Sequence, residues 1–132
     1  MKNKKSILIV DDEQDAIEFV KAILSDIDDF NVIAAKDGSE GITKAVSYKP
    51  DLIILDVILP GTDGFLVFHE LRGLKETKNI PIIMLTGVAD KVGIKFLKED
   101  MKKYTGNEPV EYLEKPIVPD TLNKAVRSVL SL

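Results

Sequence analysis

Short apolar runs that alternate with helical periodicities constrain the fold of this chain more than any other feature of its sequence. Four such runs have clear boundaries and a fifth is weaker: residues 7–10, 32–35, 52–55, 82–85 and 112–113. The first, third and fourth contain no alternating polar residues, which is typical of strands that are buried on both faces of a parallel sheet. The sequence therefore predicts a parallel sheet at the centre of the molecule.

The segments between these runs carry apolar residues at helical spacing. The first predicted helix begins near Asp12 and places apolar residues at positions 17, 20, 23, 24 and 27 on one face, with acids in the first turn, where the helix dipole favours them. Further helices are predicted at residues 41–46, from Phe65 to Leu74 after Gly64, at residues 92–101, and from Pro119 to residue 129. Five alternations of strand and helix predict an α/β protein, a doubly wound (βα)5 parallel sheet with helices on both faces.

Composition narrows the possible functions. The chain has 132 residues, 45% of them hydrophobic, which is enough for one core, and we expect a single domain over residues 1–132. The net charge of −4 and the lack of a basic stripe argue against direct binding of nucleic acid. There is no cysteine, and the apolar run after the first few residues is too short for a signal sequence or a membrane span. We therefore expect a soluble, cytoplasmic protein without a membrane partner.

Polar residues stand where the predicted strands end. Asp11 and Asp12 follow the first strand, Asp56 the third, Thr86 the fourth and Lys115 the fifth. Because parallel strands end at one edge of a sheet, these side chains are expected to share a crevice there. Clustered carboxylates repel one another and suit Mg²⁺, a hard cation that binds carboxylate oxygens together with water and phosphate.

One carboxylate surrounded by a metal, an ammonium and a hydroxyl is a set suited to phosphoryl transfer. The charge on the transferring oxygens must be neutralised and the group held in line with its acceptor. Aspartate is an established nucleophile for this purpose and forms an acyl phosphate. Asp56 is the candidate acceptor, with Asp11 and Asp12 at the metal, and Lys115 and Thr86 at the phosphoryl oxygens.

The same residues resemble a known family. Asp11-Asp12, Asp56 followed by Leu59-Pro60-Gly61 and Asp63-Gly64, Thr86-Gly87 and Lys115-Pro116 are similar to the motifs of the receiver domain of bacterial two-component response regulators, the CheY-like family. The resemblance spans nearly the whole chain, with each motif in the right order and at a strand end. It implies the flavodoxin-like strand order 2-1-3-4-5 and the function of a signalling switch rather than an enzyme.

The resemblance also implies a role for individual residues. Asp56 would be the phospho-acceptor. Mg²⁺ would be bound by Asp12 directly, by Asp11 mainly through water, by Asp56 and by the backbone carbonyl of Ile58. Thr86 would be the switch hydroxyl, Tyr112 the switch aromatic residue, and Lys115 a ligand of the phosphoryl oxygens, with a cis bond between Lys115 and Pro116.

The implied partners are proteins. A sensor histidine kinase or a phosphotransfer protein would phosphorylate Asp56, and the surface of the fourth helix, fifth strand and fifth helix would change for a downstream partner that the sequence does not identify. The chain would be a monomer or a phosphorylation-linked dimer. Ile58 and Val88 stand where the family tunes the lifetime of the phosphoryl group, and since apolar groups cannot orient water, we expect slow autodephosphorylation.

The sequence departs from the family at one place. Thr86 and Lys115 are 29 residues apart, a longer separation than is usual, and the surplus includes residues 98–109. This segment lies in the family's output surface, so the downstream partner and the role of the enlarged segment stay open.

Three alternatives remain beside the standalone switch. The chain could be the receiver portion of a longer regulator. It could be a Mg²⁺-dependent phosphatase with Asp56 as nucleophile, although phosphatases of the haloacid-dehalogenase type carry a second Asp where Ile58 stands. A flavin-binding module of the same topology would need a phosphate loop rich in Ser and Thr after the first strand, where this chain has acids.

Overall fold

A five-stranded parallel sheet forms the centre of the molecule. The computed structural model describes residues 4–27, 30–87 and 111–132. The strands are β1 (Ser6–Val10), β2 (Asn31–Ala35), β3 (Leu52–Asp56), β6 (Ile82–Thr86) and β7 (Glu111–Glu114), and their spatial order is β2-β1-β3-β6-β7. Each neighbouring pair is parallel. The predicted strands, their direction and the order 2-1-3-4-5 are confirmed.

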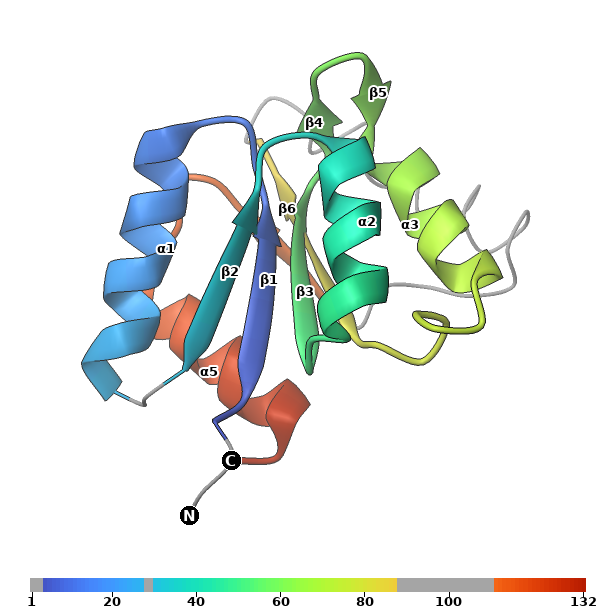
Figure 1. Cartoon of the computed structure of the whole chain (residues 1–132). Helices are drawn as coiled ribbons and strands as arrows, with labels where there is room; N and C mark the ends of the chain where they lie inside the picture. Colours follow the sequence, from blue (N-terminus) through green and yellow to red (C-terminus); the bar gives the residue numbers. More distant parts are fainter. Residues whose placement is uncertain (1–3, 28–29, 88–110) are drawn as a thin grey trace.

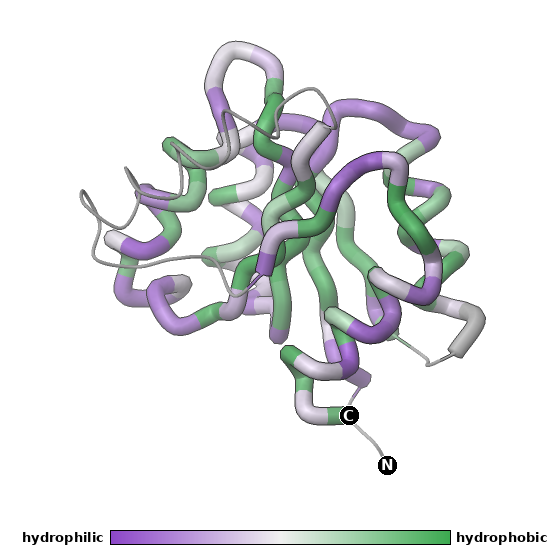
Figure 2. Tube along the Cα trace, turned by 180° about the vertical axis from the view of Figure 1, so that it is seen from behind, coloured by the Kyte–Doolittle hydropathy of each residue, from purple (hydrophilic) through white to green (hydrophobic). Residues whose placement is uncertain are grey.

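Helices cover both faces of the sheet, as Figure 1 shows. On one face lie α1 (Gln14–Ile27) and α5 (Pro119–Leu130), and on the other lie α2 (Gly38–Tyr48) and α3 (Gly64–Gly73). Buried side chains form one apolar cluster on each side, and Figure 2 shows the hydrophobic strands enclosed by more hydrophilic helix surfaces. The helix predicted at residues 92–101 lies outside the described residues.

The continuous apolar sequence of the central strands explains this two-sided core. In β3, Ile53 and Leu55 pack toward α2 and α3, whereas Leu52 and Ile54 pack toward α1 and α5. Successive side chains of a strand point to opposite faces, so a strand without polar positions must be covered on both. The same pattern in β1 and β6 places these three strands at the middle of the sheet.

Helix α2 begins earlier than predicted, at Gly38 instead of residue 41. Asp37 caps the helix by accepting a hydrogen bond from the Glu40 amide at 2.7 Å, and the Glu40 carboxylate accepts one from the Lys36 amide at 2.7 Å. This arrangement is similar to a capping box, except that Glu40 bonds the amide of Lys36, which precedes the cap, and not the amide of Asp37 itself. It fixes α2 three residues upstream of its apolar stretch.

Helix α3 ends at Gly73, so the prediction that it extends to Leu74 was wrong. Leu74 has an extended backbone (φ −97°, ψ 135°). The buried Thr77 hydroxyl donates to the Leu71 carbonyl at 2.6 Å, and this bond satisfies an acceptor at the helix end.

A short antiparallel hairpin connects β3 to α3. Its strands are β4 (Ile58–Leu59) and β5 (Thr62–Asp63), and Gly61 has the positive φ of 71° that the turn requires. The hairpin stands beside the carboxyl ends of the central strands, as Figure 1 shows. It therefore lies next to the side chains that were predicted to form a site.

Candidate functional site

The ends of four parallel strands bring the predicted side chains to one edge of the sheet. Asp11 follows β1, Asp56 ends β3, Thr86 ends β6 and Lys115 follows β7. The strand register places Leu85 opposite Asp56, and Thr86 opposite Glu114. Asp11, Asp56 and Thr86 are buried, with exposed fractions of 0%, 5% and 1%. Buried polar side chains at a strand edge require partners, and these are supplied locally.

Three carboxylates converge at this edge. One oxygen from each of Asp11, Asp12 and Asp56 lies within 4.8 Å of the other two, and Asp12 is the solvent-exposed member. The Glu13 amide donates to Asp11 Oδ1 at 3.0 Å, and the Ile58 amide donates to Asp56 Oδ1 at 3.1 Å. Main-chain amides thus orient the two buried carboxylates.

The Lys115 ammonium bridges the two buried carboxylates. Its Nζ lies 3.0 Å from Asp11 Oδ2 and 2.8 Å from Asp56 Oδ2. The Lys115 amide donates to the Thr86 carbonyl at 2.6 Å, and the bond from Lys115 to Pro116 is cis, as expected. Burial acts to lower the pKa of Lys115, but the hydrogen bonds and charges of Asp56 and Asp11 outweigh it, so the pKa is raised.

The environment of Asp56 disfavours its charged form. Burial raises the pKa of the Asp56 carboxyl above its usual value, and the charge of Asp11 acts in the same direction. Lys115 and the Ile58 amide act in the opposite direction without cancelling the effect of burial. A second cation at the site would favour the ionised carboxylate.

The donor set fits a divalent cation such as Mg²⁺. Three carboxylates face one ammonium, which leaves an excess of negative charge in a partly buried space. Carboxylate oxygens are hard ligands, and one exposed member leaves access for water and an incoming oxygen. The described residues therefore bring together the three aspartates that were predicted at a metal, and the assignment of ligands stays a prediction.

Thr86 points its hydroxyl toward β7. Thr86 Oγ1 donates to the Leu113 carbonyl at 3.3 Å, which is long for a hydrogen bond between oxygens. Tyr112, the neighbour of Leu113, is half-buried and packs against the apolar cluster on the α2 and α3 side. The hydroxyl predicted to be a switch is therefore bonded next to the predicted switch aromatic residue.

Ile58, two residues after Asp56, is an exposed apolar neighbour of the site. The residue is 62% exposed, while its amide donates to the carboxylate of Asp56, the predicted acceptor. An apolar group thus flanks the entrance to Asp56 on the hairpin side. Val88, the other predicted lifetime residue, lies outside the described residues.

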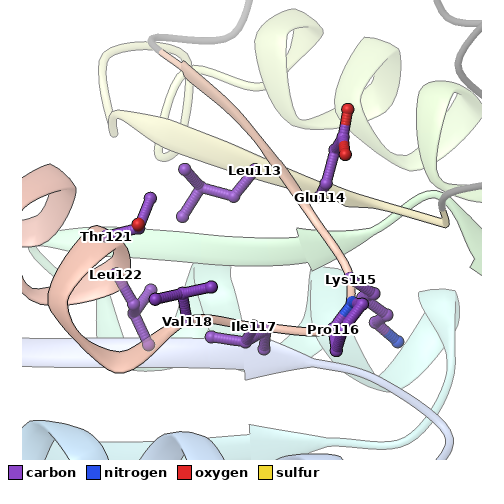
Figure 3. Close-up of a pocket in the computed structure, with 8 residues that line it drawn as sticks. All are labelled: Leu113, Glu114, Lys115, Pro116, Ile117, Val118, Thr121 and Leu122. Carbon is purple, nitrogen blue, oxygen red and sulfur yellow. The ribbon is translucent and has the colours of Figure 1, made fainter.

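Among the residues that the structure describes, two openings border Lys115. The first, of about 370 Å³, lies between the end of β7 and the first turn of α5, and in Figure 3 the Lys115 side chain points away from Thr121 and Leu122, which line this opening. The second, of about 400 Å³, lies against α1 and is lined by Phe19, Ala16, Ile117, Pro116, Lys115 and the acids Glu13 and Asp15. Lys115 therefore connects the carboxylates with two surface hollows.

Gly64 and Asp63 contribute to the site in ways that the sequence analysis missed. Asp63, which the sequence analysis gave only as part of the family motif, caps α3 by accepting from the Leu66 amide at 2.9 Å. The Gly64 amide donates to the carbonyl of Val57, the residue directly after Asp56, at 2.6 Å. An Asp immediately before a helical stretch is a cap signal that the sequence carries, whereas the approach of Gly64 depends on tertiary packing.

Comparison with known proteins identifies the family. A family model described as the response regulator receiver domain matches residues 7–127. The chain belongs to this family. Receiver domains are signalling modules of two-component systems, and the fold and strand order described above are those that the family resemblance implied.

Individual relatives share this domain. The Alkaline phosphatase synthesis transcriptional regulatory protein PhoP of Bacillus subtilis is 37% identical over 128 residues, which is 96% of this chain and 48% of PhoP. A putative response regulator from Chloroflexus aurantiacus superposes with a TM-score of 0.85 at 30% identity, covering 98% of this chain and 100% of that one.

A third relative was solved with a metal. The receiver domain of the sensor histidine kinase PA1611 from Pseudomonas aeruginosa, with a magnesium ion coordinated in its active site cleft, has a TM-score of 0.79 at 25% identity. The alignment covers 98% of this chain and 100% of that structure.

Several curated relatives are longer than this chain. The chain spans about half the length of PhoP and of the probable transcriptional regulators ycf27 to which it is also similar. Among residues 4–27, 30–87 and 111–132, no helix is both long and apolar enough to cross a membrane.

Proposed function

We propose that this receiver domain is a phosphoryl-accepting switch in which Asp56 takes a phosphoryl group in the presence of Mg²⁺. One observation carries the proposal: carboxylate oxygens of Asp11, Asp12 and Asp56 lie within 4.8 Å of one another, and Lys115 bridges the buried pair. The proposed metal ligands are these three aspartates and the backbone carbonyl of Ile58. Bound Mg²⁺ would neutralise negative charge on the transferring oxygens.

The chain's own residues carry the transfer. An Asp56 carboxylate oxygen attacks the phosphorus of a phosphohistidine, the bond from phosphorus to the imidazole nitrogen breaks, and the imidazole leaves with the electron pair of that bond. The Ile58 amide orients the attacking carboxylate at 3.1 Å. The Lys115 ammonium, now 2.8 Å from Asp56, stays close enough to bind an oxygen of the phosphoryl group.

The switch follows from the bond of Thr86. Its hydroxyl donates a hydrogen bond to the Leu113 carbonyl at 3.3 Å. A phosphoryl oxygen that carries negative charge is a stronger acceptor than a carbonyl. When the hydroxyl turns to Asp56, the contact with β7 is lost and Tyr112 can repack. The surface of β7 and α5 then changes for a downstream partner; the fourth helix, which completes the predicted output surface, lies outside the described residues.

The phosphoryl donor is proposed to be a protein, a sensor histidine kinase or a phosphotransfer protein. The hollow of about 400 Å³ beside α1 shares Lys115 with the carboxylate cluster and exposes Phe19. An apolar surface with the acids Glu13 and Asp15 beside it would complement a helix of the donor protein that combines apolar and basic side chains. The Pseudomonas relative is itself the receiver domain of a sensor histidine kinase, and this supports a donor of that class.

The domain is proposed to act in the cytoplasm either alone or as the receiver portion of a longer regulator. Residues 1–132 are proposed to form one receiver domain, and the match to about half of PhoP favours the longer arrangement. In that arrangement the change at β7 and α5 would reach an adjoining effector domain. In the other, it would reach a separate protein.

Acetyl phosphate labelling tests the acceptor. Wild type with MgCl₂ is expected to gain one phosphoryl group by intact-protein mass spectrometry, and Asp56→Asn none. Asp120→Asn, an exposed acid in the first turn of α5, is the matched control and should label like wild type. Label on Asp56→Asn would show that the acceptor is another residue. Removal of Mg²⁺ with EDTA should stop the reaction in wild type and in Asp120→Asn.

The lifetime of the product is proposed to be long. The exposed Ile58 side chain offers no group that could orient an attacking water toward the acyl phosphate. The decay of label after removal of acetyl phosphate measures this lifetime, and faster decay in wild type than in Ile58→Asn would contradict the proposal.

A further inference from the structure

Gly64, the first residue of α3, packs against the main chain of the acceptor strand. A Cβ atom built on Gly64 would collide with the Asp56 carbonyl oxygen and would lie 2.8 Å from Val57 Cα and 3.0 Å from the Asp56 carbonyl carbon. All three atoms belong to the main chain, so no rotamer change could make room. By contrast, a Cβ on Gly38 would meet side-chain atoms of Val67 and Thr62.

Hydrogen bonds hold residues 56–58 both at the carboxylate cluster and at the start of α3. The Asp56 carboxylate bonds the Ile58 amide at 3.1 Å and Lys115 at 2.8 Å, and the Val57 carbonyl accepts from the Gly64 amide at 2.6 Å. The short stretch from residue 56 to 58 is therefore clamped between the start of α3 and the carboxylate cluster.

A displacement of this stretch would act directly on the site. It carries the proposed acceptor and the backbone carbonyl of Ile58, and it orients one carboxylate oxygen through the Ile58 amide. The Asp63 cap and the pairing of Ile58 with Asp63 keep α3 in place, so the strain of an added methyl group would fall on residues 56–58.

We propose that Gly64 is a positioning residue for phosphoryl acceptance: the absence of its side chain sets the place of the Asp56 main chain, and with it the distances among the acceptor, Lys115 and the metal ligands. This inference rests on the proposed function and adds a residue that touches neither phosphoryl group nor metal. Displacements of about 1 Å in such a site reduce rates by roughly a hundredfold.

The test compares Gly64→Ala with two controls in the full chain. Gly73→Ala adds the same methyl group at the other end of α3, where it would contact nothing beyond its own helix and chain neighbours within 4 Å. Asp37→Ala removes the cap of α2 and lowers stability away from the site. Mg²⁺ affinity by calorimetry and the labelling rate with acetyl phosphate at saturating Mg²⁺ are measured beside the melting temperature. Gly64→Ala should lose roughly tenfold or more in both, and both controls should stay within about twofold of wild type.

A wild-type measurement covers the case in which Gly64→Ala does not fold. In a MgCl₂ titration followed by amide NMR, the Gly64 signal should shift with the same midpoint as Ile58, while the Gly73 signal stays in place. Either of two results overturns the inference: a folded Gly64→Ala with the wild-type Mg²⁺ affinity and labelling rate, or a Gly64 amide signal that does not shift when MgCl₂ is added. Failure of wild type to bind Mg²⁺ or to become labelled would instead contradict the proposed function.

Discussion

The surroundings of Asp56 disfavour the charged form of its carboxyl group, and Lys115 is the main local compensation. Burial raises the pKa of Asp56, whereas the raised pKa of Lys115 reflects its two carboxylate partners. Sequence reasoning located these residues because parallel strands end at one edge. It could not locate the bonds of Lys115 to both Asp11 and Asp56, or the bond of Thr86 to the Leu113 carbonyl, since these depend on rotamers and strand register.

Asp56→Asn is expected to be more stable than wild type at neutral pH without Mg²⁺. Because the folded protein raises the pKa of Asp56, it binds the proton more tightly than the unfolded chain does. Stability therefore falls as the pH rises from about 4, the ordinary pKa of Asp, through the raised value. The amide avoids this loss, so the advantage of the variant should vanish below about pH 4.

Urea denaturation across this pH range, with EDTA present, measures the difference. Glu70→Gln, a change of an exposed acid in the second half of α3, is the control and should follow the wild-type curve. A variant that is less stable than wild type at pH 7 and recovers on acidification would show that the ion pair with Lys115 outweighs the cost of burial.

At the scale of the elements, the ends of the helices depend on capping hydrogen bonds, which the pattern of apolar residues does not show. The start of α2 is set by Asp37 and Glu40, and their spacing is a capping-box signal that the sequence carries. The end of α3 is set by Thr77, a bond across six residues that no local pattern indicates. The two-residue strands of the β4 and β5 hairpin are too short to produce a periodicity.

Arg72→Lys tests how α3 is joined to the beginning of β6. Arg72 Nη1 donates to the Ile80 carbonyl at 2.7 Å, and the guanidinium lies 4.9 Å from the centre of the Phe68 ring. An ammonium cannot stack and bond in this planar manner, so we expect a loss of about 1 kcal/mol in the free energy of unfolding by urea denaturation. Lys78→Arg, an exposed change nearby, should have no effect.

The same variant should leave the site intact. Ile80 precedes β6, whereas the carboxylates lie where the strands end. Mg²⁺ affinity and acetyl phosphate labelling within about twofold of wild type are therefore expected. A large fall in labelling without loss of stability would mean that this end of α3 communicates with the site.

For the whole molecule, the sequence was sufficient to predict class, strand order and the location of the site. Continuous apolar runs in β1, β3 and β6 required a sheet covered on both faces, and the order of motifs resembled one family. The packing of Gly64 against the Asp56 main chain was beyond sequence reasoning because it joins two elements through the absence of a side chain.

Mg²⁺ is expected to stabilise the whole fold. A ligand that binds only the folded protein adds about 2.7 kcal/mol at a hundred times its Kd, and the carboxylate cluster exists only when β1 and β3 are paired. Thermal melts with and without MgCl₂ measure this gain, with NaCl at matched ionic strength as control. Asp11→Asn should show a much smaller gain. An equal gain in NaCl would indicate general screening instead of a site.

Because the strands are parallel, the edge of the sheet opposite the carboxylates can carry a label or a surface tether. Residues that precede β6, among them the exposed Lys78, lie one strand length, ~16 Å, from the edge that carries Asp56. The sequence has no cysteine, so Lys78→Cys would introduce a single thiol. A fluorophore attached there, or a surface tether, would leave the carboxylate edge facing outward to kinases and effectors.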